Sequence, residues 1–193
     1  NSLGVSMCIG TLAYEEHLGS SNQTVGEDAV GATVVKVDAG TAFNVGDIIA
    51  FSSADASSNA SNFAHVTGDE GNEYEITAIN THDLTIRLKD NPNGGGLKAV
   101  IPDNTFIRRR WAFYDLFDSA PGTSTYASEN DRGTLDEIHI VVYDTSGALS
   151  GFVVDANGQR TNAVLEIYSN LSVNNNAKGP QGDSIFYTDV IYL

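Results

Sequence analysis

The strongest β-strand signal in this chain lies in Asp136-Glu137-Ile138-His139-Ile140-Val141-Val142-Tyr143-Asp144. Its centre is almost continuously apolar and rich in β-branched side chains, a pattern that favours a strand covered on both faces. The residues Asp-Thr-Ser-Gly at 144–147 then predict a turn, and 148–154 predicts a returning strand. The second half of the chain is therefore expected to be built around a hairpin.

Residues downstream of this hairpin predict a helix and then a further strand. Apolar side chains between 164 and 171 recur at helical spacing, and Thr161 or Asn162 can cap a helix that begins there. The segment 174–183 is polar and indicates a loop, whereas 185–193 is apolar enough to predict a strand. These elements give the second half a mixed α/β character.

The first half predicts a small antiparallel β domain. An entering strand at 2–12 and a polar connection at 15–28 precede four short strand candidates with turns between them: 32–37, 47–51, 73–79 and 84–88. Such spacing favours a small barrel or sandwich, and the breaker cluster at 91–96 places its end near Pro102.

The predicted class is α+β, mainly β, with three parts. Residues 1–17 form a strand and connector of the core domain, 18–100 the small β-barrel-like insertion domain, and 101–193 a mixed α/β domain that is incomplete at its C-terminal end. The chain starts at Asn1 without Met and ends within an apolar run, so we expect a piece of a longer polypeptide.

Composition argues against several kinds of partner. The 193 residues include 25 acidic and 10 basic ones, a net charge of −15, so phosphate backbones and anionic membranes would be repelled. No run approaches the roughly 18 apolar residues of a membrane helix, and no signal peptide opens the chain. We therefore expect no nucleic-acid partner and no membrane insertion. The lone Cys8 lies in an apolar run, which predicts a buried thiol.

The sequence contains no residue pattern that supports an enzymatic function. The histidines at 17, 65, 82 and 139 are scattered, no HExxH pair occurs, and no Gly-flanked serine resembles a nucleophile elbow. His139 is expected to be a hydrogen-bonded structural residue rather than a ligand or base, and Glu15-Glu16-His17 a solvated connector rather than a site. The acidic stretches 69–73 and 155–158 could supply calcium ligands, but neither completes a twelve-residue loop, so acidic turns are the better interpretation. We predict no catalytic residue, no metal and no cofactor.

Arg108-Arg109-Arg110 followed by Trp111 admits two interpretations. Basic and aromatic side chains together can bind a nucleic acid. In so acidic a chain, however, pairing with carboxylates of this subunit or of a neighbour is the favoured hypothesis. A strand here would direct Arg108 and Arg110 to one face and Arg109 to the other.

A resemblance to a known family covers the region from about Trp111 to Leu193. The order of several short motifs resembles the tail sheath proteins of T-even-type contractile bacteriophages. These motifs are Pro121-Gly122-Thr123-Ser124, Asp136 to Val142, Asp144, Gly147, Leu149, Gly151, Val164-Leu165-Glu166, Leu171-Ser172, Asn176-Ala177-Lys178, Gly182, Tyr187 and Val190-Ile191. The family carries smaller inserted surface domains ahead of this stretch, and the barrel-like region resembles one of them. The link at 152–162 is longer than the family's, and the family's terminal arms and tube-contacting domain are not in this chain.

The resemblance implies a structural role in the virion. A sheath subunit is assembled in the host cytoplasm, binds other copies in a helical array around the tail tube protein, meets baseplate and tail terminator proteins, and contracts to drive the tube through the host envelope. Subunit-contact residues are expected among Arg108, Arg109, Arg110, Asp136, Glu137 and Lys178. The alternative hypothesis is a β-rich module of a tail spike or fibre that binds a host surface glycan or protein.

Overall fold

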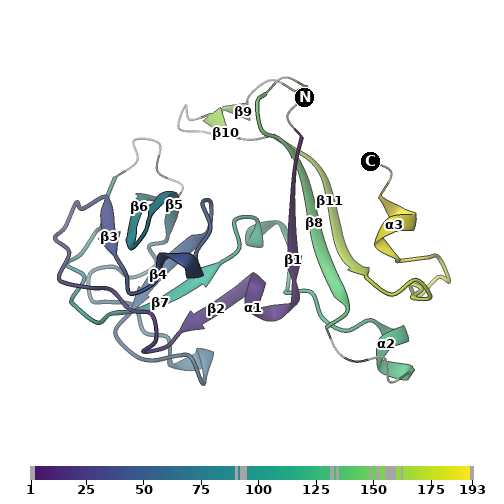
Figure 1. Cartoon of the computed structure of the whole chain (residues 1–193), viewed down its shortest axis with the longest axis horizontal. Helices are drawn as coiled ribbons and strands as arrows, with labels where there is room; N and C mark the ends of the chain where they lie inside the picture. The colour runs from purple at the N-terminus through teal and green to yellow at the C-terminus, as the bar shows by residue number, and fades with distance from the viewer. Residues whose placement is uncertain are drawn as a thin grey trace. The chain divides into compact units, whose positions relative to one another are not determined.

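The computed structural model describes residues 3–89, 91, 95–130, 133, 135–147, 149–150, 153–154, 160–161 and 163–191. Strands dominate and the helices are short, which agrees with the predicted mainly-β class (Figure 1). The described residues divide into two compact units. Unit 1 draws on Asn1–Tyr14, Phe113–Asp155 and Gln159–Leu193, and unit 2 on Glu15–Ala112.

Unit 2 holds an antiparallel sheet whose strands, among the described residues, follow the order β2-β7-β4-β5-β6-β3. Its elements are β2 (Glu15–Leu18), β3 (Val34–Lys36), η1 (Gly40–Ala42), β4 (Ile48–Ser52), η2 (Ala60–Asn62), β5 (Tyr74–Asn80), β6 (Asp83–Leu88) and β7 (Phe106–Arg110). The four strands predicted for the first half are confirmed as β3, β4, β5 and β6. The hairpin β5–β6 closes with Asn80 opposite Asp83, and Thr81 between them adopts a positive φ of 56°, as tight hairpin turns require.

One large apolar cluster fills unit 2. Alternate side chains of the strands point inward, as the period of two in a pleated strand dictates. The cluster consists of Leu18, Val35, Val37, Phe43, Ile49, Phe51, Val66, Tyr74, Ile76, Leu84, Ile86, Leu97, Ile101 and Ile107, all buried. Every strand of the sheet contributes to it, so this unit encloses its own core.

The sheet of unit 2 is wider than the predicted domain 18–100. Residues 15–17, expected in a solvated connector, join residue 18 in β2, and 106–110, expected in the following domain, form β7 between β2 and β4. Leu18 and Ile107 lie opposite each other and both enter the core. Charged residues obscured both strands in the sequence, but Arg109 and Arg110 of β7 pair with Glu16 and Glu15 of β2 across the ladder.

Unit 1 is organised around a smaller antiparallel sheet of order β1-β8-β11. Its elements are β1 (Leu3–Ile9), α1 (Gly10–Tyr14), η3 (Tyr114–Leu116), α2 (Thr125–Glu129), β8 (Glu137–Asp144), β9 (Val153–Val154), β10 (Arg160–Thr161), β11 (Ala163–Ser172) and α3 (Tyr187–Val190). The central strand β8 is buried from Ile138 to Val142, as its apolar sequence predicts. On one face, Ile138 and Ile140 pack with Leu171 of β11 and with Tyr187 of α3.

Two predictions for the C-terminal region are wrong. Residues 163–172 form the strand β11, not a helix, and pair with β8. The β-branched and aromatic side chains of this segment suit a strand. Two register shifts, with Asn170 at a φ of 52°, break the strict alternation and leave a spacing that imitates a helix. Conversely, 187–190 of the predicted strand 185–193 form the helix α3, which places Tyr187 and Val190 on the same face against the Ile138 cluster.

The hairpin predicted for 136–154 is wrong, because β8 pairs with β1 and β11, and the described part of the predicted strand 148–154 does not pair with it. Val153–Val154 form β9, which pairs with β10, and residues 149 and 150 lie in a turn. Residues 148, 151 and 152, most of the link 152–162 and the possible calcium ligands at 155–158 lie outside the described residues. No helix in the described parts of the chain has the length and apolar character needed to cross a membrane.

Candidate interaction sites

The arginines of β7 are paired within this chain. Arg108 Nη2 and Arg110 Nη1 both donate to Glu73 Oε1, at 2.6 and 2.7 Å, and Arg110 Nε donates to Glu15 of β2. Burial alone would raise the pKa of Glu15, but the hydrogen bond and the charge of Arg110 outweigh it and lower the pKa. The two guanidinium groups share one face of the sheet, as the strand prediction required.

Arg109 points to the opposite face. Its Nη2 donates to Glu16 Oε2 at 2.7 Å, and its Nη1 donates to the backbone carbonyl of Ala42 at 2.8 Å. Its side chain, like those of Arg108 and Arg110, is mostly covered. The favoured hypothesis of carboxylate pairing is therefore confirmed within the subunit, and contact of these arginines with another subunit stays a prediction.

An aromatic group covers the paired face. The guanidinium of Arg108 lies 4.4 Å from the centre of the Phe63 ring, a cation–π contact. His17 and His65 meet the edge of the same ring, with centroids 5.5 and 4.9 Å away, and His17 Nε2 lies 3.1 Å from Glu15 Oε1. The cluster Glu15-Glu16-His17, expected in solvent, is instead part of a packed strand.

Asp136 holds three segments of unit 1 together. Its side chain is only 9% exposed. Oδ1 accepts the backbone N–H of Ser124 at 2.7 Å, while Oδ2 accepts the hydroxyls of Ser124 and Ser172 at 2.7 and 2.5 Å. Burial by itself would raise the pKa of Asp136, but these hydrogen bonds to the charged form lower it. The carboxylate thus ties the start of α2 and the end of β11 to β8.

Glu137 and Lys178, the other predicted contact residues, differ in their surroundings. Glu137 Oε2 accepts the backbone N–H of Gly122 at 3.0 Å and the side-chain amide of Asn170 at 2.7 Å. Lys178 is exposed, and no side-chain partner for it occurs among the described residues. Asp136, just before β8, and Glu137, the first residue of β8, stabilise unit 1 itself, whereas Lys178 has its ammonium group available on the surface.

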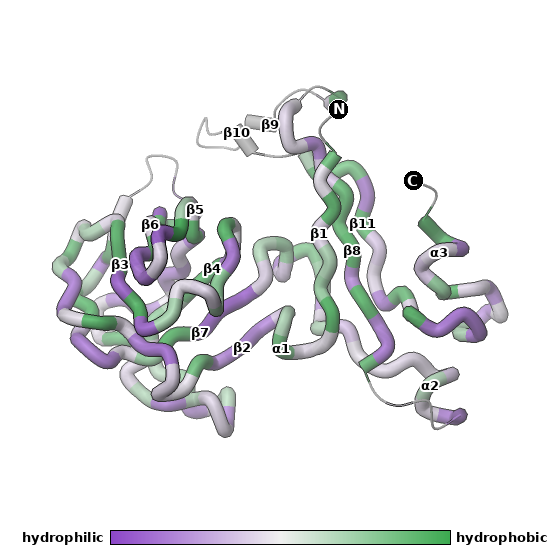
Figure 2. The backbone as a smooth tube through the Cα atoms, viewed as in Figure 1, coloured by the Kyte–Doolittle hydropathy of each residue, from purple (hydrophilic) through white to green (hydrophobic). Residues whose placement is uncertain are grey.

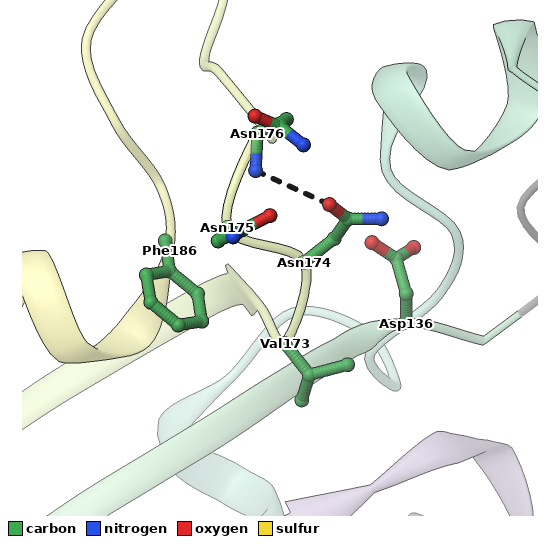
Figure 3. Close-up of a pocket in the computed structure, with 6 residues that line it drawn as sticks. All are labelled: Asp136, Val173, Asn174, Asn175, Asn176 and Phe186. Carbon is green, nitrogen blue, oxygen red and sulfur yellow. Dashed lines mark hydrogen bonds between the residues drawn. The ribbon is translucent and has the colours of Figure 1, made fainter.

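A shallow surface pocket of about 450 Å³ lies beside Asp136 (Figure 3). It is lined by Asp136, Val173, Asn174, Asn175, Asn176 and Phe186. In the view of Figure 3, the loop that carries the asparagines lies between Phe186 and Asp136. The backbone N–H of Asn176 donates to Asn174 Oδ1 at 3.2 Å, which fixes the loop's turn. The lining is therefore rich in neutral amides and has one aromatic ring.

An exposed apolar row runs along β1, an edge strand of the sheet in unit 1. Leu3, Val5, Met7 and Ile9 are 51%, 49%, 48% and 57% exposed, although the strand was predicted to enter a core. The small side chains of the strand occupy the other face, where Cys8 is fully buried as predicted. Figure 2 colours much of β1 and β8 as hydrophobic. Because residues opposite each other across a ladder share a face, this row extends the buried face of β8 outward.

His139 has a structural role, as predicted. It is 1% exposed and stacks on Phe117 with ring centroids 4.1 Å apart. Its Nε2 lies 2.8 Å from the carbonyl of Ser119, and its Nδ1 accepts the backbone N–H of Asn170 at 3.1 Å. Both hydrogen bonds require the neutral ring with its proton on Nε2. Within the described residues, no group of three or more His, Cys, Asp or Glu side chains is arranged to hold a metal ion.

A scan against protein-family models and a search of curated proteins find no match to this chain. The apolar row of β1 and the asparagine pocket were both missed as sites in the sequence. Large apolar and small side chains alternate in 3–9, which indicated the row. No local pattern indicated which of the two faces of the strand would be covered. The run Asn174-Asn175-Asn176 was the sequence signal for the pocket, but by itself it predicts only a loop.

Proposed function

We propose that this chain is part of the tail sheath of a contractile bacteriophage and acts by assembly rather than catalysis. The sequence resemblance from Trp111 to Leu193 supports the family, and the exposed apolar row on β1 is the structural observation that carries the assembly role. The helix predicted from the apolar side chains between 164 and 171, which would also suit the resemblance, is a strand in the structure. The proposal therefore rests on the motifs around β8 and on the surface of β1.

The sequence of the edge strand β1 has none of the charged or proline residues that keep strands from pairing with other chains. Natural edge strands are protected by lysines, prolines, bulges or a covering element. Residues 3–9, Leu-Gly-Val-Ser-Met-Cys-Ile, contain no charge and no proline, and the described register with β8 is unbroken. An added strand would extend the main-chain ladder and cover the apolar row at the same time. We expect that strand to come from another copy of the protein.

Assembly of this type explains a helical array. A heterologous contact, in which two different surfaces of the same subunit meet, forms an open helix when its rotation does not close. Contraction then requires a second packing of nearly rigid subunits that is lower in free energy. The acidic excess of the chain, with a net charge of −15, would keep crowded outer surfaces soluble.

Within this proposal, unit 2 is a small barrel inserted into the sheath protein. The segment after β2 supports closure, because Thr24 bridges Val37 next to β3 and its N–H donates to the carbonyl of Thr105 next to β7. Unit 1 is part of the mixed sheath domain. The partners are further copies, the tail tube protein, and the baseplate and terminator proteins, and the location is the phage tail after assembly in the host cytoplasm.

Negative-stain electron microscopy of the full-length protein, alone and mixed with tail tubes, tests the proposal. We expect sleeves or short helical tubes. The double variant Val5→Lys/Met7→Lys should remain folded and lose assembly, because two buried lysines would disrupt an added strand. The control Val34→Lys changes a side chain that is 46% exposed on the edge strand β3 of unit 2, and it should assemble normally. Discrete monomers or trimers that bind host cells and never polymerise would instead support the receptor-binding alternative.

A further inference from the structure

We propose that the pocket lined by Asp136, Val173, Asn174, Asn175, Asn176 and Phe186 binds an uncharged saccharide. This inference does not depend on the sheath role, since all six residues that line the pocket belong to unit 1. Its size, about 450 Å³, lies within the range of small-ligand sites, roughly 300–1,000 Å³, and would admit one or two sugar rings.

The asparagines supply the polar groups that hydroxyls require. Asn175 and Asn176 are exposed, and within the described residues neither side-chain amide has a hydrogen-bond partner. Each amide carries two donors and an acceptor in one plane, and a sugar hydroxyl is likewise both donor and acceptor. Two adjacent amides can therefore bind neighbouring hydroxyls of one ring.

Phe186 and Val173 supply the apolar surface. Val173 is 50% exposed, and Phe186 is partly exposed, with its ring held edge to face against Tyr187 at 5.2 Å. The faces of a sugar ring that bear C–H groups are apolar and cover an aromatic ring in the way other apolar groups do. Figure 3 shows this ring on the side of the loop away from Asp136.

The loop is held in place before any ligand arrives. Ser172 donates to Ile185 through its backbone at 2.8 Å and to Asp136 through its hydroxyl at 2.5 Å. The backbone N–H of Val173 donates to the carbonyl of Asp136 at 2.9 Å, and that of Asn174 to Ser172 Oγ at 2.9 Å. A loop fixed in this way loses little conformational entropy on binding. Asp136 is thus a positioning residue for the pocket.

The charges around the pocket favour a neutral ligand. Among the described residues no cationic side chain lines the pocket, and the chain has a net charge of −15, so an anion is disfavoured. A cation would need the carboxylate of Asp136, whose oxygens already accept hydrogen bonds from Ser124 and Ser172. Neutral amides and an aromatic ring remain, which is the chemistry of saccharide recognition.

Nuclear magnetic resonance titration of the 193-residue chain with glucose, galactose and N-acetylglucosamine tests the proposal. We expect at least one sugar to shift the backbone amide signals of 173–176 and 186 selectively. The double variant Asn175→Ala/Asn176→Ala should weaken binding about tenfold, because each lost hydrogen bond contributes a few-fold. Asn80→Ala, which changes an exposed asparagine on β5, is the matched control and should leave the affinity unchanged.

Three results would overturn the inference. The first is the absence of any selective shift with all three sugars up to about 50 mM, where even millimolar binding would be visible. The second is equal binding by the double variant and the wild type. The third is a set of shifts that maps elsewhere on the chain. Both asparagines are exposed, so the variant is expected to fold, and its unperturbed signals outside the pocket will verify this.

Discussion

The two units of this chain bury their apolar side chains in different ways. In unit 2, every strand of the sheet contributes to one enclosed cluster that includes Phe51 and Tyr74, both fully buried. In unit 1, the cluster around Ile138 and Ile140 is small, and the same face of the sheet continues into the exposed row of β1. Unit 2 thus encloses its apolar cluster, whereas unit 1 leaves apolar side chains exposed on an edge strand.

The two units also differ in how many large hydrophobic side chains they expose. Unit 2 exposes a few that are scattered, which is normal for soluble proteins. They are Val25, Val30, Val34, Val45 and Val100. Among the described residues unit 1 exposes more of them, several along β1 and β11, the two edge strands of its sheet: Leu3, Val5, Met7, Ile9, Leu12, Leu116, Leu135, Leu149, Val164, Leu165, Ile167 and Val173. Concentration of such residues on one sheet is typical of interaction surfaces.

The largest expected effect is a difference in independent folding. A chain limited to 15–112 should unfold in one cooperative transition, because it contains the whole enclosed core. A second chain, in which a short Gly-Ser linker joins 1–14 to 113–193, should self-associate and bind a hydrophobic dye. The linker is short because Tyr14 Oη already donates to the carbonyl of Tyr114 at 2.8 Å. Chemical denaturation and light scattering give the two readouts. A monomeric, dye-free second chain would remove the distinction between the units.

The next largest effect is the difference in the free energy of unfolding between substitutions of a buried and of an exposed apolar residue. Phe51→Ala removes a fully buried ring from the centre of unit 2 and should lower the free energy of unfolding by about 3–5 kcal/mol. Met7→Ala, at a side chain that is 48% exposed on β1, should change it by less than about 0.5 kcal/mol. Urea denaturation of the isolated chain measures both. A large loss for Met7→Ala would mean that the row is already covered.

The sequence was sufficient for elements whose signal is local. Continuous apolar character identified β8, and alternation between turns identified β3, β4, β5 and β6. Arg108 to Arg110 were correctly expected to pair with carboxylates, but Glu15 lies 95 residues from Arg110, and no local pattern indicates such a partner. For the same reason β2 was mistaken for a connector.

Other features could not be predicted from the sequence because tertiary contacts override the local spacing of apolar residues. Bulges in β11 gave its apolar residues a helical spacing, and only pairing with β8 makes that segment a strand. In β1 the alternation was visible, yet which face would be covered depends on packing by distant elements. The asparagine pocket needs the loop after β11 and the segment before α3 to meet, through the backbone hydrogen bond from Ser172 to Ile185.

A third prediction concerns the carboxylate that ties unit 1 together. Asp136→Asn should cost about 1.5–3 kcal/mol at neutral pH, since hydrogen bonds to a charged group are replaced by weaker ones. The folded-state pKa of Asp136 is lowered from its ordinary value of 3.8. Its contribution is therefore present above that value and lost as the pH falls through the folded-state pKa. Denaturation between pH 7 and pH 2 should show the gap between variant and wild type closing in acid. A gap that stays constant would contradict this assignment.

The smallest expected effect has the opposite sign and belongs to unit 2. Asp69 is fully buried; its Oδ1 accepts the hydroxyl of Tyr74 at 2.5 Å, while its buried Oδ2 has no partner among the described residues. Burial raises the pKa of Asp69 above its ordinary 3.8 despite these hydrogen bonds. The folded state then holds this proton more tightly than the unfolded state, so stability falls as the pH rises from 3.8 through the folded-state pKa. Asp69→Asn keeps an acceptor for Tyr74 and does not titrate, so its stability relative to the wild type should increase across that interval. Because Asp136 and Asp69 report on separate units, opposite slopes for the two variants in the same pH series would distinguish a carboxylate whose hydrogen bonds outweigh the effect of burial on its pKa from one for which burial outweighs the hydrogen bonds.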